Sequence, residues 1–179
     1  VTDETVAQTK ASLAHQRGKH RWAHIGHMFI WECMRASLGD VCLYENMVLD
    51  PGWIRDYCRV YTDLFRECFV RLIEGAGKPD GVWLYEDLGY KERIFCSPRQ
   101  YQDIIFPFYA EMVALFHGYD LPVVLHTCGL TEPLLDLIVE AGFDGLNPME
   151  VKAGNRPLWI AENYGDRLCL IGGLDARVL

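Results

Sequence analysis

Short apolar segments alternate with helix-like segments along this chain of 179 residues, and this alternation restricts the fold more than any other feature. The apolar segments are residues 22–26, 81–85, 122–125, 145–146 and 168–171. A strand followed by a helix and then by another strand is the parallel βαβ unit, in which helices cover the sheet. Polar residues stand only at the carboxyl ends of these strands. The pattern therefore predicts an α/β fold, and above all a (β/α)8 TIM-type barrel.

The most clearly marked helix starts after Asp50. This residue is a favourable N-cap, proline follows at the first helical position, and Gly75 marks the other end. In between, apolar residues recur at steps of three and four: Trp53, Tyr57, Val60, Tyr61, Leu64, Cys68 and Leu72. Further helices are expected at residues 28–38, at 97–117 with a bend at Pro107, at 133–141 and at 157–164.

The chain is shorter than a complete barrel. A closed barrel has eight strands and typically about 250 residues, whereas five strands are predicted here and Leu179 lies where a further helix begins. No linker or change in composition divides the sequence. We therefore expect one partial TIM-barrel domain, residues 1–179, truncated at both ends. Such a piece exposes unpaired strand edges and apolar faces, so it is expected to aggregate or to form a homo-oligomer.

Charge and hydropathy exclude two classes of partner. The chain has 17 Lys and Arg residues against 25 Asp and Glu residues, a formal net charge of −8, and lacks the basic stripe of a surface that binds nucleic acid or an anionic membrane. No apolar run approaches the roughly 18–20 residues of a membrane span, and residues 1–16 do not resemble a signal peptide. Seven scattered cysteines do not form the paired framework of a secreted domain. These features predict a cytoplasmic protein with reduced cysteines.

Polar side chains gather at the carboxyl ends of the predicted strands, where TIM-type barrels carry their active sites. They are Glu86, Asp87, His126, Cys128, Asn147, Glu150 and Asp175. Catalytic roles, including general acid or base, are predicted for the carboxylates among them: Glu86, Asp87, Glu150 and Asp175. Structural alternatives exist, because Glu86 and Asp87 are also suited to capping the following loop, and Asn147 and Glu150 to forming a turn.

An imidazole and a thiol stand two residues apart in the segment His126-Thr127-Cys128-Gly129, where an apolar strand runs into a glycine turn. Residues i and i+2 of an extended segment point to the same side, so His126 and Cys128 can reach one ion. Both are good zinc ligands, but a tight zinc site needs at least three protein ligands. The sequence therefore predicts a metal pair that another residue must complete.

Several motifs resemble those of the uroporphyrinogen decarboxylase superfamily in order and spacing, from about residue 26 to the end of the chain. They are Asp80-Gly81-Val82, Glu86-Asp87-Leu88-Gly89, Ser97-Pro98, His126-Thr127-Cys128-Gly129, Asn147-Pro148-Met149-Glu150, Tyr164-Gly165-Asp166-Arg167 and Gly172-Gly173-Leu174-Asp175. Each motif alone is weak, but together they are specific for the superfamily. The resemblance implies a (β/α)8 barrel, in agreement with the predicted strands.

This superfamily has two branches with different chemistry. One removes carboxylates from the acetate side chains of uroporphyrinogen, a tetrapyrrole of porphyrin biosynthesis, without a cofactor. Its arginine-rich start and early catalytic aspartate are not found here, since the basic residues 16–21 do not match them. The other branch comprises zinc-dependent methyltransferases that act between a corrinoid (cobalamin) protein and a thiol or other acceptor. Its His-x-Cys signature is similar to His126 and Cys128, and its further cysteine would fall beyond Leu179.

By this resemblance we favour the methyltransferase branch. It implies His126 and Cys128 as zinc ligands, and a corrinoid protein as the partner. A carboxylate is a candidate further ligand: Glu32, Glu86 or Glu150. Zinc suits this chemistry because it keeps a bound thiol as the nucleophilic thiolate near neutral pH. Two alternatives stay open: metal-free decarboxylation of uroporphyrinogen, and a non-catalytic module that binds a corrinoid protein or a tetrapyrrole. In members of the superfamily that need no metal, the His–Cys pair is structural or contacts the substrate.

Overall fold

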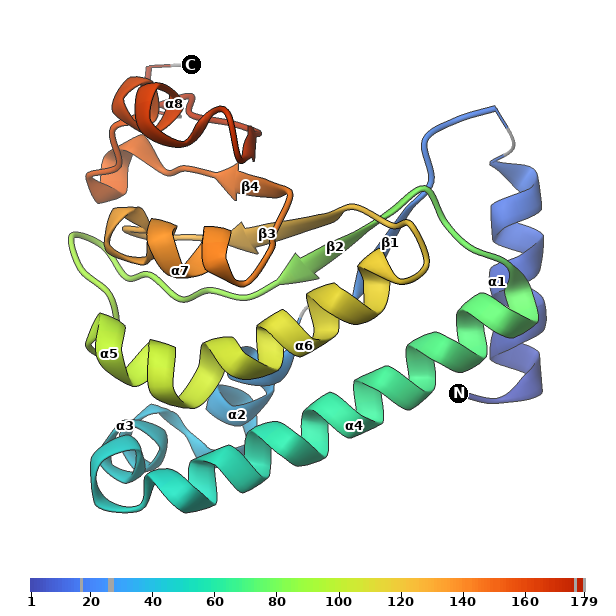
Figure 1. The fold of residues 1–179 in the computed structure, drawn as a ribbon, viewed down its shortest axis with the longest axis horizontal. Helices are drawn as coiled ribbons and strands as arrows, with labels where there is room; N and C mark the ends of the chain where they lie inside the picture. Colours follow the sequence, from blue (N-terminus) through green and yellow to red (C-terminus); the bar gives the residue numbers. More distant parts are fainter. Residues whose placement is uncertain (17, 26–27, 176, 179) are drawn as a thin grey trace.

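The computed structural model describes every residue of the chain except residues 17, 26–27, 176 and 179 (Figure 1). Its sheet has five parallel strands that lie side by side in chain order. They are β1 (Trp22–Ile25), β2 (Gly81–Tyr85), β3 (Val123–Thr127), β4 (Gly145–Pro148) and β5 (Cys169–Leu170). The predicted α/β class and the five strands are confirmed; the predicted end of the first strand, Gly26, lies outside the described residues.

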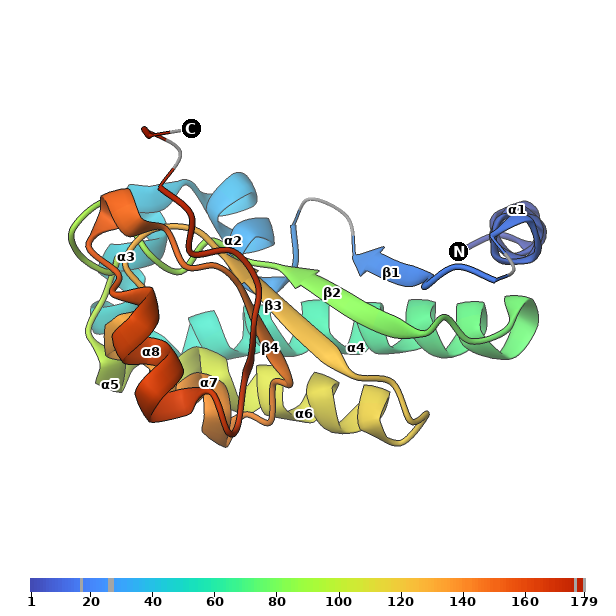
Figure 2. The same ribbon diagram turned by 90° about the horizontal axis from the view of Figure 1, so that it is seen from above.

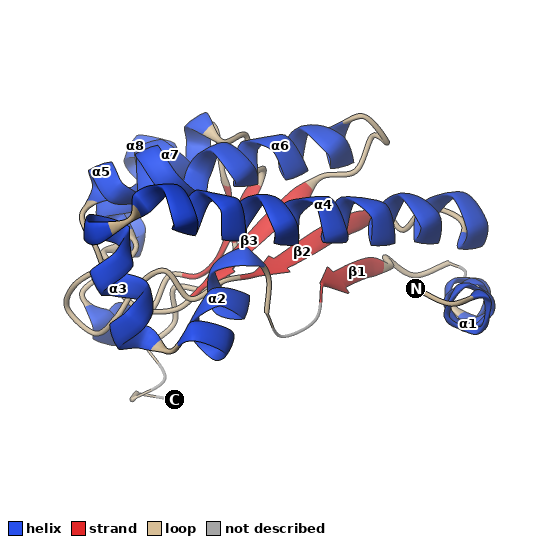
Figure 3. Cartoon of the chain, turned by 90° about the horizontal axis from the view of Figure 1, so that it is seen from below, coloured by secondary structure: helices blue, strands red, loops and turns tan. Residues whose placement is uncertain are grey.

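Helices of different lengths connect the strands. They are α1 (Asp3–His15), α2 (Ile30–Leu38), α3 (Asp40–Leu49), α4 (Pro51–Ala76), α5 (Pro98–Gln100), α6 (Phe106–His117), α7 (Leu135–Glu140) and α8 (Pro157–Tyr164), with a π-helical turn η1 (Tyr101–Ile105) and 3-10 turns η2 (Glu132–Leu134) and η3 (Val151–Ala153). The helices α4, α6 and α7 lie on the same side of the strands (Figures 2 and 3). Among the described residues, no helix combines the length and the hydropathy that a membrane span requires.

The side chains of β2 and β3 alternate between the helix-covered face of the sheet and the opposite, open face. Val82, Leu84 and Leu125 are fully buried and belong to the hydrophobic core that the strands share with α4 and α6. Trp83 and His126, on the intervening positions, are only half-buried. The alternation therefore separates the core from the open face, residue by residue.

Helix α4 has the predicted ends to within one residue, but it buries a different stripe. The Asp50 side chain caps it by accepting a hydrogen bond from the amide of Trp53 at 3.1 Å. The buried side chains are Ile54, Cys58, Thr62, Phe69, Ile73 and Ala76. Val60 and Leu64, from the predicted stripe, are 65% and 50% exposed. Apolar residues occupy two neighbouring faces of this helix, and tertiary packing selects the one that is buried.

The predicted bend at Pro107 takes the form of the π-helical turn η1, which comes directly before α6. Proline lacks an amide hydrogen, so the carbonyl of Asp103, four residues earlier, loses the donor that it would have in an α-helix. Arg55 of α4 supplies one, because its Nε donates to this carbonyl at 3.2 Å. The amide of Phe106 donates to Tyr101, five residues back, which is the hydrogen-bond pattern of a π-helix.

Helices α1 and α3 were not predicted from the sequence. α1 buries no side chain and starts with a capping box formed by Thr2 and Thr5. α3 buries Leu43 and Met47 but leaves Val41 and Val48 71% and 68% exposed. Neither helix has the single apolar face on which a periodicity argument depends.

Glu86 joins the end of β2 to the start of α2. The N-cap residue of α2, Phe29, has no side-chain hydrogen bond to offer. The two carboxylate oxygens of Glu86 take its place and accept hydrogen bonds from the amides of Trp31 (2.8 Å) and Glu32 (2.9 Å). Burial raises the pKa of Glu86 to about 8, although these amide donors favour the charged form. Glu86 therefore has a structural role as the cap of α2.

We expect Glu86→Ala to lower the free energy of unfolding by about 2–4 kcal/mol, because two buried amides lose their acceptors. Glu86→Gln keeps one carbonyl oxygen and should lower it by less. Glu45→Ala, which removes an exposed glutamate from α3, is the control and should change it by less than about 0.5 kcal/mol. Urea denaturation of the three variants measures these differences. Equal effects of Glu86→Ala and Glu45→Ala would contradict the capping role.

Candidate metal centre

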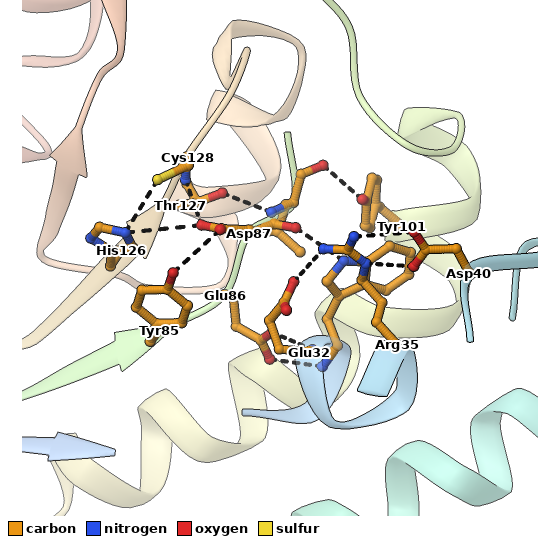
Figure 4. A network of polar contacts seen from close by, with 12 residues as sticks. Glu32, Arg35, Asp40, Tyr85, Glu86, Asp87, Tyr101, His126, Thr127 and Cys128 are labelled. Atoms are coloured by element: carbon orange, nitrogen blue, oxygen red, sulfur yellow. Dashed lines mark hydrogen bonds and ion pairs between the residues drawn. The ribbon is translucent and has the colours of Figure 1, made fainter. Parts of the chain in front are cut away.

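Asp87, His126 and Cys128 bring a carboxylate oxygen, an imidazole nitrogen and a thiol sulfur together at the carboxyl ends of β2 and β3 (Figure 4). The three ligand atoms all lie within 4.8 Å of one another. Cys128 Sγ is 3.4 Å from His126 Nε2, and this nitrogen is 3.9 Å from Asp87 Oδ1. In the part of the chain that the structure describes, no other group of three such side chains is this close together.

Strand register explains why these residues meet. Tyr85 of β2 pairs with His126 of β3. Asp87 and Cys128 come two residues later on each chain segment, so both point to the same open face as the paired residues. The amide of Cys128 donates to Asp87 Oδ1 at 2.9 Å, which fixes the carboxylate beside the thiol. The register of β2 and β3 therefore brings the three side chains of the cluster together.

Two glycines allow the loops that carry the cluster to approach each other closely. A Cβ atom on Gly129 would lie 2.3 Å from the carbonyl carbon of Gly89, and Gly129 has a positive φ of +81°. A Cβ on Gly89 would lie 2.6 Å from the carbonyl oxygen of Cys128. The amide of Leu130 then donates to the carbonyl of Tyr90 at 2.9 Å. Only glycine at both positions permits this backbone contact between the loops after β2 and β3.

The imidazole of His126 is held from two sides. Its Nδ1 lies 2.6 Å from Oδ1 of Asn147 on β4. Its ring stacks on that of Tyr85, with centroids 4.6 Å apart and an interplanar angle of 11°. Nε2 is left facing Cys128 and Asp87, as a metal ligand requires.

Burial and nearby carboxylates hold Cys128 as a thiol. Burial has the largest effect, the negative charges of Asp87 and Glu150 add to it, and together they raise the pKa of Cys128 to about 12. A thiol with this pKa is a poor nucleophile, whereas a bound dication supplies the positive charge that stabilises a thiolate ligand. The cluster is therefore better suited to a metal site than to a cysteine nucleophile.

A family model described as Uroporphyrinogen decarboxylase (URO-D) matches residues 44–179. The chain belongs to the uroporphyrinogen decarboxylase family. Among solved structures it is similar to a methyltransferase from Methanosarcina mazei, with a TM-score of 0.58 and 19% sequence identity, over 74% of this chain and 36% of that one. At this identity the likeness shows the fold alone, and the chain spans well under half the length of that protein. A comparison with curated proteins found no match.

The carboxylates predicted as site residues of this family member do not all reach the cluster. Glu86 points to the helix-covered face, where it caps α2. Glu150 borders the cluster: one of its oxygens accepts from the amide of Gly129 at 2.7 Å, and the other lies 3.2 Å from Lys152 Nζ. Asp175 is engaged by Arg177 at 2.5 Å.

The carboxylate that joins His126 and Cys128 is Asp87, in place of the three glutamates proposed as further ligands. Glu32 is paired with Arg35 at 2.6 Å, while Glu86 and Glu150 have the partners given above. The physical reason for the correction is the alternation along β2, which places Asp87 on the open face and its neighbour Glu86 on the other. Tyr85, two residues before Asp87, shares the open face and was not predicted as a site residue; its spacing from Asp87 is the signal that identifies it.

A pocket of about 490 Å³ opens beside the cluster. Its lining includes Asp87, Tyr90, Phe95, Cys128 and Lys152, together with Arg35. The guanidinium of Arg35 lies 4.5 Å from the centre of the Phe95 ring and is 2.8 Å from a carboxylate oxygen of Asp40. The pocket therefore offers metal-ligating groups next to cationic and aromatic side chains, a combination that suits a small polar substrate.

We expect Gly129→Ala to separate the two loops, because its Cβ would clash with the backbone of Gly89. Gly39→Ala is the matched control: Gly39 also has a positive φ (+78°), but nothing lies within 4 Å of an added Cβ. The control should cost only the backbone strain of about 1–3 kcal/mol, and Gly129→Ala at least about 1 kcal/mol more. Parallel denaturation curves measure the difference; identical destabilisation would show that the loop contact is not required.

Proposed function

We propose that this protein is a zinc-dependent methyltransferase that transfers a methyl group between a corrinoid protein and a thiol or another acceptor. The observation that carries the proposal is the cluster of Asp87, His126 and Cys128 at the carboxyl ends of the strands. Membership of the uroporphyrinogen decarboxylase family is compatible with it, because the superfamily that the sequence resembles contains both decarboxylases and such methyltransferases.

The donor set fits zinc. Nitrogen, sulfur and oxygen ligands are the three kinds that protein zinc sites use, at about 2.0–2.3 Å from the metal. Tetrahedral geometry at these lengths separates ligand atoms by about 3.3–3.8 Å. The distances of 3.4 Å from Cys128 to His126 and 3.9 Å from His126 to Asp87 are close to this range. These three ligands would leave one position of a tetrahedral site open, for a substrate as in catalytic zinc sites or for the further cysteine that the resemblance places beyond Leu179.

Zinc at this position would supply Lewis acidity that keeps a substrate thiol as a thiolate near neutral pH. The residues of the chain have separate tasks around it. Asp87, His126 and Cys128 hold the metal, and the pocket beside them receives the acceptor. Glu150, which lines the pocket, is the candidate acid or base near the substrate. A catalytic role for Asp175 would require its release from Arg177.

A specific observation favours decarboxylation as the second candidate. Three cationic side chains line the pocket, namely Arg35, Lys91 and Lys152, and cations suit a substrate rich in carboxylates. Two of them already have carboxylate partners, Arg35 with Glu32 and Lys152 with Glu150. The positive charge of these two side chains is therefore already neutralised in part, and less of it is available to bind a substrate with several carboxylates. For this reason we favour methyl transfer.

We expect the purified full-length protein to bind one zinc ion, and Asp87→Asn, His126→Ala and Cys128→Ala each to weaken zinc binding by more than about 100-fold. Partners outside the ligand shell alone contribute about 10–100-fold, so loss of a ligand should exceed that. His15→Ala and Cys169→Ala remove exposed residues of the same types and should leave zinc unchanged. Competition with a chromophoric chelator measures the affinities.

The same preparations decide between the reactions. Zinc-loaded protein should transfer a methyl group from methyl-cobalamin to a thiol, and the ligand variants should not. A zinc-free wild-type protein would contradict the proposal. Conversion of uroporphyrinogen by metal-free protein would establish the decarboxylase, and stoichiometric zinc without methyl transfer would indicate a binding module.

A further inference from the structure

Asn147 contacts the side of the His126 ring that faces away from the cluster. The two residues are register partners on β4 and β3, so their side chains project from the same face of the sheet. Asn147 Oδ1 lies 2.6 Å from His126 Nδ1, a short hydrogen bond between half-buried groups. The contact is therefore built into the pairing of the two strands.

The orientation of the Asn147 amide is fixed by a second hydrogen bond. Its Nδ2 donates to the carbonyl of Ile171, just after β5, at 3.1 Å. A flipped amide would place Nδ2 at the ring and set Oδ1 against that carbonyl oxygen, which cannot donate a hydrogen bond. The carbonyl oxygen of the amide must therefore face the imidazole.

An oxygen acceptor at Nδ1 decides where the proton of the neutral imidazole sits. Only a protonated Nδ1 can donate to Asn147 Oδ1, so Nε2 carries the lone pair. That lone pair faces Cys128 Sγ, 3.4 Å away, and Asp87 Oδ1, 3.9 Å away. The stack on Tyr85 keeps the plane of the ring in this direction. The nitrogen that faces the cluster is thus the one free to bind a metal.

We propose that Asn147 is a positioning residue that acts through His126: it sets the Nδ1–H tautomer and so presents Nε2 to the metal before the metal binds. This inference rests on the proposed zinc function for the identity of the metal. A hydrogen bond from the second ring nitrogen of a metal-ligating histidine orients the ring and raises ligand affinity. Here a neutral amide oxygen supplies that bond in place of a carboxylate.

Two substitutions separate positioning from simple tethering of the strands. Asn147→Asp keeps an oxygen at Nδ1 but loses the hydrogen bond to Ile171. Asn147→Ala loses both bonds. A purely structural residue would make the two variants equally defective, whereas a positioning residue predicts rescue by aspartate. Asn163→Ala, on the exposed surface of α8, serves as the control.

The first readout is the tautomer of His126 in the metal-free full-length protein, from a long-range proton–nitrogen-15 spectrum in alkaline buffer, where imidazole groups are neutral. The signal is assigned by its loss in His126→Gln. Wild type and Asn147→Asp should show a proton on Nδ1, and Asn147→Ala should shift it to Nε2. A wild-type His126 with its proton on Nε2 would overturn the inference.

The second readout is affinity for zinc alone, measured by chelator competition. Asn147→Ala should bind zinc about 10–100-fold more weakly than wild type, while Asn147→Asp and Asn163→Ala should stay within about threefold, well below that range. Equal losses in Asn147→Ala and Asn147→Asp would overturn the positioning role. Failure of the zinc function itself has a different signature, because the wild type would then take up no zinc, whatever its tautomer.

Discussion

The candidate site depends on the parallel pairing of β2, β3 and β4 in one register. This register sets Tyr85, His126 and Asn147 in a row across three strands. Because side chains alternate along a strand, Asp87 and Cys128 form a second row on the same face, two residues further on. A shift of β2 by one residue would turn Asp87 to the helix-covered face and put Glu86 or Leu88 in its place, depending on the direction of the shift. The geometry of the candidate metal cluster is thus a consequence of strand pairing more than of the loops.

The same alternation ties the site to the hydrophobic core. Glu86 turns to the helix-covered face and caps α2, while Thr127 Oγ1, between the candidate metal ligands His126 and Cys128, accepts from the amide of Leu88 at 2.9 Å. Side chains with structural roles therefore alternate with candidate metal ligands at the carboxyl ends of both strands. The cap also places α2 so that its Arg35 reaches the pocket beside Asp87. Substitutions in the hydrophobic core at this edge of the sheet are therefore expected to alter the geometry of the site.

The sequence was sufficient for features that depend on local pattern. It predicted the ends of α4 from Asp50 and a glycine, the five strands, and the pairing of His126 with Cys128 on one side of a strand. The predictions from sequence were wrong for features that depend on how several helices and strands pack together. The choice of Asp87 over Glu86 follows from which face each residue joins, and the buried stripe of α4 follows from packing against α6. Helices with mixed or polar faces, such as α1 and α3, carry no periodic signal at all.

The charges around the cluster are the remaining physical argument for a metal. Two of the three cations that line the neighbouring pocket already have partners, since Arg35 pairs with Asp40 and Lys152 with Glu150. Among the described residues, the partners of the Asp87 carboxylate are the amide of Cys128, the Tyr85 hydroxyl at 3.4 Å and His126 at 3.9 Å. A half-buried carboxylate without a cation is unfavourable. One dication beside the Asp87 carboxylate and a Cys128 thiolate would balance both negative charges, with His126 as the neutral third ligand. The carboxylates that add to the effect of burial in holding the Cys128 thiol protonated are the same groups that favour a bound cation.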